Sequence, residues 1–331
     1  PPAWALAATA ATGAAGVGAA VWLAHSGDRW HDLALAARRL PQILFPMVLT
    51  TGVMLFFFGP DGQDVGLLVT FLLASAGYGL LASYFPAAVF AHAAVWSSVG
   101  ALVLVNRLVT VPYEWLAAAV SGMAAFYLTG GYWLGREQTG FLDERLQNDY
   151  RWAAGIAGFS LLAAGILAGV LVLAVELWAG VAALVLGALV LVWSSYLFRQ
   201  PLLMLAGTGL LILPFTLAAN QVLAEMALVQ PDAWLMASWA GLALIYLALA
   251  VAGRRAERYV CWFNLWAHIL APVAVAGLVA NYGLTRTEWS AIPSVVALGG
   301  VMLVYVASAV IHDSGRFPAL SSYVTSVSYT H

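Results

Sequence analysis

The feature that most constrains this chain is a series of uncharged, apolar stretches about as long as a membrane is thick. Residues 177–197 and 201–220 are two of them, and neither contains Asp, Glu, Lys or Arg. An α-helix of about 20 residues can cross the roughly 30 Å of bilayer hydrocarbon while satisfying its own backbone hydrogen bonds. With 63% hydrophobic and only 8% charged residues, the chain lacks the polar surface of a water-soluble domain. The sequence therefore predicts an all-α integral membrane protein.

Hydropathy along the chain predicts about eleven membrane spans, as expected for a multi-pass helix bundle. The predicted spans are residues 3–24, 42–59, 65–84, 86–106, 114–135, 152–174, 177–197, 201–220, 233–252, 259–281 and 290–311. Pro201 supports the start of a new helix, since proline suits the first helical turn. We expect one transmembrane domain over residues 1–312, followed by a polar C-terminal tail over residues 313–331.

A repeated pattern of acid and tryptophan residues indicates how the spans are grouped. Tryptophans 115, 178, 234 and 289 are 63, 56 and 55 residues apart, and each follows an acid by one or two residues. The acids are Glu114, Glu176, Asp232 and Glu288. A period of roughly 55 residues that contains two spans predicts tandem helical hairpins, which bury their faces by stacking on their neighbours.

The arginines predict the orientation of the chain. Eleven of the thirteen lie in connections that follow odd-numbered spans, and only Arg107 and Arg286 follow even-numbered ones. Cytoplasmic connections carry the excess of positive charge. We therefore expect the N-terminus outside and the C-terminus in the cytoplasm, in the inner membrane of a bacterium. The chain contains no lysine, which excludes a lysine Schiff base with retinal or pyridoxal phosphate.

The best candidate for intramembrane chemistry is a polar face on the tenth span. Asn264, His268 and Pro272 are four residues apart and therefore share one side of a helix. His92 precedes Asn106 by fourteen residues, much as His268 precedes Asn281 by thirteen. One interpretation makes the two histidines haem ligands or part of a proton path. The interpretation that we favour is that each hydrogen-bonds a neighbouring helix, and the sequence predicts no particular cofactor or metal.

The repeated acids have a simpler explanation than cation binding. A carboxylate directly before a helix interacts favourably with the helix dipole and can cap exposed N–H groups. Asn106, Asn220 and Asn281 are similarly interpreted as residues that end helices, because asparagine tolerates the left-handed conformation found there.

The predicted cytoplasmic connections hold two further features. Arg254, Arg255 and Arg258 form a cluster that could bind anionic lipid head groups, although a topology signal alone would explain it. Residues 136–151, and more weakly 26–41, show an apolar stripe that would suit a helix on the membrane surface; an ordinary solvated loop is the alternative.

No motif places the chain in a family, and common catalytic signatures such as His-Glu-x-x-His or Cys-x-x-Cys are absent from the sequence. The spans look continuous and the hairpins parallel, which favours a tandem array over a transporter built from inverted repeats. Our leading hypothesis is a structural or anchoring subunit of a larger membrane assembly, with lipids and other protein subunits as partners and no nucleic acid. The alternatives are a transporter or flippase for an apolar or lipidic substrate, and a redox subunit with haem on His92 and His268.

Overall fold

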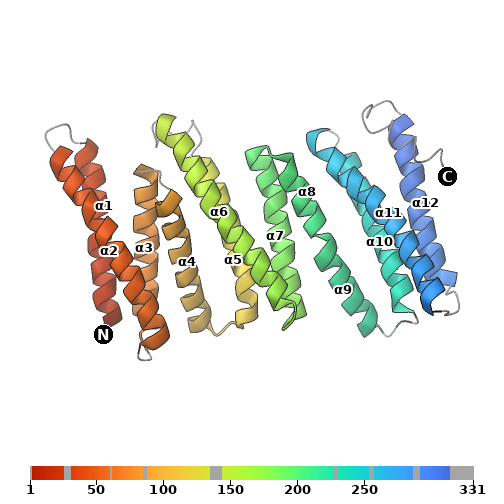
Figure 1. Cartoon of the computed structure of the whole chain (residues 1–331), viewed down its shortest axis with the longest axis horizontal. Coiled ribbons are helices and arrows are strands. Elements are labelled where there is room, and N and C mark those ends of the chain that lie inside the picture. Colours follow the sequence, from red (N-terminus) through yellow and green to blue (C-terminus); the bar gives the residue numbers. More distant parts are fainter. Residues whose placement is uncertain are drawn as a thin grey trace. The chain divides into compact units, whose positions relative to one another are not determined.

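The computed structural model describes residues 2–25, 31–59, 62–84, 88–134, 144–226, 228, 230–252, 257–285 and 291–313. These residues are almost entirely helical and include no strand, and each of the eleven predicted spans corresponds to a helix or a pair of consecutive helices (Figure 1). The predicted all-α, multi-pass architecture is therefore confirmed. The predicted tail lies outside the described residues beyond Asp313, so its boundary stays a prediction.

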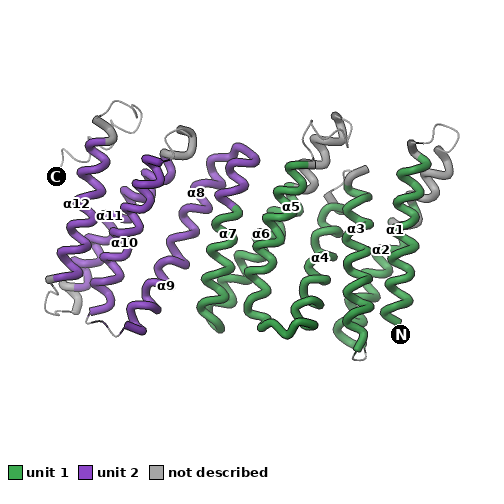
Figure 2. The backbone as a smooth tube through the Cα atoms, turned by 180° about the vertical axis from the view of Figure 1, so that it is seen from behind, with its two compact units in different colours: residues 1–190 green, residues 191–331 purple. Residues whose placement is uncertain are grey.

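The chain divides into two compact units, residues 1–190 and 191–331, which Figure 2 colours separately. The helices that begin in the first unit are α1 (Pro2–His25), α2 (His31–Phe58), α3 (Asp64–Tyr84), α4 (Ala88–Val109), the 3-10 helix η2 (Tyr113–Trp115), α5 (Leu116–Leu134), α6 (Glu144–Val172) and α7 (Leu177–Phe198). Helix α1 packs on α2 and α3, α3 on α4, α4 on α6, and α5 on α6. Successive hairpins thus lie against one another within this unit.

The second unit is organised around α10. After the end of α7 come α8 (Pro201–Leu210), α9 (Ile212–Glu225), α10 (Pro231–Ala252), α11 (Glu257–Thr285) and α12 (Ala291–Asp313). Helix α10 packs on α9, α11 and α12, and α8 packs on α11. The core between α10, α11 and α12 consists of small and aliphatic side chains around Tyr246, including Ala243, Ala271 and Val304.

Within the described residues, nine helical segments are long and apolar enough to cross a membrane. Helices α8 and α9 count as one of these segments, Pro201–Glu225. The apolar part of α2, Gln42–Phe58, is shorter, and α5 is not among the nine. The predicted spans 42–59 and 114–135 are therefore helices whose passage through the membrane remains a prediction, whereas the multi-pass character of the chain does not depend on them.

Close packing in the first unit depends on glycines that face large side chains. Phe45 of α2 is fully buried, and a Cβ on Gly13 of α1 would lie 2.9 Å from its ring. A Cβ on Gly77 of α3 would overlap the same ring, whose centroid lies 4.9 Å from that of the Tyr78 ring, with the two planes tilted by 45°. Lipid provides no hydrophobic force between helices, so close van der Waals contact of this kind holds them together.

A second close contact joins α5, α6 and α7. A Cβ on Gly165 of α6 would lie 3.0 Å from the backbone nitrogen of Ser121 on α5, and one on Gly169 would lie 2.8 Å from Cβ of Ala183 on α7. Gly165 and Gly169 are the small-xxx-small pair of this helix, a spacing that lets backbones approach closely.

The helix ends place some of the predicted flanking residues as expected and others differently, whereas capping by their side chains stays a prediction. Glu176 directly precedes α7, as predicted, whereas Asp232 lies within the first turn of α10 and Glu114 within the 3-10 helix η2. The side-chain amide of Asn106 donates to the carbonyl of Val111 at 2.9 Å, beyond the end of α4.

The predictions for Asn220 and Asn281 are wrong, because Asn220 lies inside α9 and Asn281 lies inside α11, which continues to Thr285. The left-handed residue after α4 is Thr110 rather than Asn106. Glu288 lies outside the described residues.

Two predicted surface segments instead begin longer helices. Residues 144–151 are the first turns of α6, and residues 31–41 are the first turns of α2. The remaining parts, residues 136–143 and 26–30, lie outside the described residues. In both places the amphipathic segment and the apolar segment that follows it form one helix. A continuous helix keeps the backbone hydrogen bonds that a break between the two segments would remove.

We predict that Gly165→Ala destabilises the protein by about 1–3 kcal/mol, because the added methyl group meets backbone that cannot move aside cheaply. The control is Gly122→Ala on α5, next to Ser121, where a Cβ meets nothing within 4 Å. This control should be neutral or slightly stabilising, since alanine is the better helix former. Unfolding by sodium dodecyl sulfate in mixed micelles, followed by circular dichroism, measures both, and equal stability of the two variants would contradict the packing described.

Candidate functional site

The polar face predicted on the tenth span lies on α11 at its contact with α12. Nε2 of His268 is 3.2 Å from Oγ of Ser308, which is fully buried on α12. The imidazole also lies against the ring of Tyr305, with 5.9 Å between ring centroids. Asn264, one turn earlier on α11, is buried with 7% of its surface exposed. The sequence thus identified the histidine and the asparagine, and the structure adds Ser308 and Tyr305 as neighbours of His268.

His92 lies on α4 in the first unit and is half-buried, whereas His268 belongs to the second unit. Among the described residues, no group of three or more His, Cys, Asp or Glu side chains is placed to hold a metal ion. The observed partners of His268 are those of a histidine that links two helices. Haem binding by the two histidines stays a prediction, which a visible absorption spectrum lost in a double His→Ala variant would support.

The predicted lipid head-group cluster cannot be placed. Arg254 and Arg255 lie outside the described residues, and Arg258 is in the first turn of α11, where side chains are likewise not described. Another arginine does find a partner: Nε of Arg107 on α4 lies 3.4 Å from Oδ2 of Asp64, in the first turn of α3. This pair joins the ends of two neighbouring helices and is partly exposed, with 40% of the Arg107 side chain and 22% of the Asp64 side chain accessible. A partly exposed ion pair of this kind contributes little stability.

An interruption between α8 and α9 was not predicted. The helix assignment breaks at the single residue Leu211, three residues before Pro214, whose missing N–H removes one backbone hydrogen bond. Leu211 itself keeps a helical backbone conformation, and its N–H still donates to the carbonyl of Gly207. Close to this point, the hydroxyl of Tyr246 on α10 donates to the backbone carbonyl of Thr208. A second bond joins the same two segments, because Nε1 of Trp239 on α10 donates to Oγ1 of Thr216 on α9 at 3.0 Å. The eighth predicted span is therefore two consecutive helices that together form one apolar segment, Pro201–Glu225.

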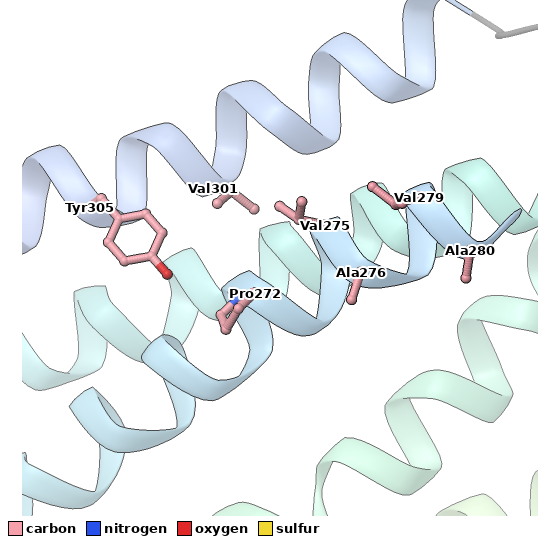
Figure 3. A pocket seen from close by; sticks show the side chains of 7 residues that line it. All are labelled: Pro272, Val275, Ala276, Val279, Ala280, Val301 and Tyr305. Atoms are coloured by element: carbon pink, nitrogen blue, oxygen red, sulfur yellow. The ribbon is translucent and has the colours of Figure 1, made fainter. Parts of the chain in front are cut away.

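Helix α11 contains a proline of its own, Pro272, in the middle of the helix. Near it lies a hollow of about 540 Å³ on the surface of α11 and α12 (Figure 3). The side chains that line it are apolar except for one hydroxyl group: Pro272, Val275, Ala276, Val279, Ala280, Val301 and Tyr305. We call this hollow the α11–α12 groove. Its signal in the sequence was available, because Pro272, Ala276 and Ala280 follow one another at four-residue spacing.

Comparison with known proteins adds no identity. Neither family models nor curated proteins nor solved structures gave a significant match to this chain. The function must therefore be argued from the residues and their arrangement.

We predict that His268 and Ser308 stabilise the second unit as a coupled pair. Within the described residues, His268 is the partner of the buried Ser308 hydroxyl, so His268→Ala leaves that hydroxyl unpaired. Once His268 is gone, Ser308→Ala should cost almost nothing. A double-mutant cycle on the free energy of unfolding should give a coupling of about 0.5–1.5 kcal/mol.

Ser238→Ala on α10 is the matched control, because this hydroxyl bonds the carbonyl of Leu235 in its own helix at 2.7 Å. Its effect should add to that of His268→Ala without coupling. A coupling of zero between His268 and Ser308 would contradict the pairing.

Proposed function

We propose that this protein is an integral-membrane structural or anchoring subunit of a larger membrane assembly. The observation that carries the proposal is the stacking of hairpins through residues without side chains, as where Gly165 and Gly169 of α6 meet α5 and α7. Such packing favours a rigid element over one that must open and close, since filled interfaces resist continuous deformation.

The polar residues of the spans support a structural role. Many hydroxyl groups bond their own helix, as Thr50 does with the carbonyl of Pro46 at 2.8 Å and Thr216 with that of Ile212 at 2.7 Å. Such hydroxyl groups find a hydrogen-bond partner within their own helix, as polar groups in lipid require.

The outward faces of the helices supply surface for lipids and for partner proteins. Large apolar side chains such as Phe58, Phe126 and Leu171 are more than 70% exposed. In a membrane such faces are covered by acyl chains or by the helices of other subunits. Together with the repeated Trp residues near helix starts, they would provide the contact surfaces of an anchoring subunit.

The proposed location is the cytoplasmic membrane of a bacterium, with the N-terminus outside. The unequal distribution of the arginines supports this orientation. We expect an alkaline phosphatase reporter to be inactive when fused after Arg258, on the proposed cytoplasmic side, and active when fused after Glu288. Reversed activities would contradict the orientation, and equal activities would contradict the membrane crossing of α11.

We expect native mass spectrometry of the protein, extracted gently from its own membrane, to show discrete complexes well above the 35.0 kDa of one chain. Other polypeptides should be present at fixed ratios. A single chain that carries only lipid or a cofactor would contradict the structural proposal.

A transporter or flippase for an apolar substrate is the second candidate, and the interruption at Leu211 together with Pro272 favours it. Both are in helices of the second unit, and α8 packs on α11. Helix α11 is continuous through Pro272, so the break at Leu211 and this internal proline are the points in these two helices that resemble the discontinuous helices of secondary transporters. A lone chain with bound lipid in the native mass spectrum would support this candidate at the expense of the first.

A further inference from the structure

The α11–α12 groove results from the small side chains on one face of α11. Pro272, Ala276 and Ala280 lie one turn apart along that face, and none of them is long enough to fill the space beside α12. Valines complete the walls, and the described lining includes no charged side chain. The volume of about 540 Å³ lies within the range of about 300–1,000 Å³ found for small-molecule sites.

The groove begins near the middle of the apolar span of α11 and extends to the C-terminal end of that span, where Ala280 is the last residue but one. The apolar span of α11 runs from Cys261 to Asn281, so Pro272 is one residue from its midpoint. Figure 3 shows the hydroxyl of Tyr305 directed from α12 towards Pro272. At about 1.5 Å of rise per residue, this hydroxyl lies only a few ångströms from the membrane midplane. Water is absent at that depth, and a polar group without a partner there is costly.

Tyr305 is a positioned hydrogen-bond donor. Its hydroxyl has no hydrogen-bond partner among the described residues, although the residue lines the groove. Its ring lies against the imidazole of His268, which Ser308 holds in turn. The hydroxyl is therefore fixed by its neighbours while its own bonding capacity faces the groove.

We propose that the α11–α12 groove binds an uncharged, membrane-dissolved molecule with an apolar body and a carbonyl oxygen, of the quinone class. The Tyr305 hydroxyl donates to that carbonyl, and Val275, Val279 and Val301 contact the apolar body. A charged ligand does not fit, because no lining side chain would compensate its charge at this depth. The ester carbonyls of phospholipids lie at the membrane interface, near the Ala280 end of the groove, and not at the depth of the Tyr305 hydroxyl. The proposal holds whether or not the chain belongs to an assembly.

The test is photochemical labelling of the whole chain in liposomes. One probe is a benzoquinone with a decyl chain that carries a diazirine, and the matched probe is the same diazirine-bearing chain without the quinone. Labelled peptides of α11 and α12 are quantified by mass spectrometry. The variants are Tyr305→Phe, which removes only the hydroxyl, and Ala276→Phe, which fills the groove. The control is Val273→Phe, on the same helix at an exposed position outside the groove lining.

The proposal predicts saturable labelling by the quinone probe that is several times stronger than labelling by the hydrocarbon probe. Tyr305→Phe should weaken apparent binding about fivefold, the usual effect of one hydrogen bond. Ala276→Phe should abolish saturable labelling, and Val273→Phe should leave it unchanged. Equal labelling by both probes, or no effect of Tyr305→Phe in a variant that elutes as the wild type does, would overturn the proposal and leave the groove to ordinary acyl chains.

Discussion

The structure depends on how closely its helices can approach one another in a solvent that does not drive them together. In lipid, apolar side chains gain nothing by leaving the medium, so contact area and hydrogen bonds must hold the bundle. Phe45 illustrates the consequence, since its ring occupies the space left by Gly13 and Gly77 on two neighbouring helices. Gly165 does the same for the backbone at Ser121. Where the helices carry small residues but no large side chain fills the space, as along Pro272, Ala276 and Ala280, a groove remains.

The sequence was sufficient to predict the helices because each span is long, uncharged and bounded by residues with a local preference. Pro201 begins α8, and Trp178 lies in the first turn of α7, as the repeat indicated. The interruption at Leu211 was missed even though Pro214 was visible in the sequence. Hydropathy averages over a window and does not register the loss of one backbone hydrogen bond, so a span made of two consecutive helices and a single long helix look alike. The end of α9 was misplaced for a related reason: Asn220 is as compatible with a helix interior as with a helix end.

The candidate site was only half visible for a different reason. Asn264 and His268 stand out as polar residues in an apolar span, and their four-residue spacing places them on one face. Their partners come from another helix, and a single sequence does not say that α12 is the neighbour of α11. Tyr305 and Ser308 do share a face of α12 at three-residue spacing, which would have been a usable signal. The pair Asp64 and Arg107 was hidden in the same way, since the two residues lie on different helices.

The central claim is that all the apolar stretches cross the membrane as tandem hairpins, so that successive connections alternate between its two sides. Single cysteines placed in the connections of a Cys261→Ser protein, and exposed to a membrane-impermeant maleimide in intact cells, test this most directly. The account predicts labelling at Gly62, Thr110, Val175 and Gln230, and none at Gln200 until the membrane is permeabilised. Labelling of Thr110 and Val175 from opposite sides would show that α5 or α6 does not cross, and would contradict the account.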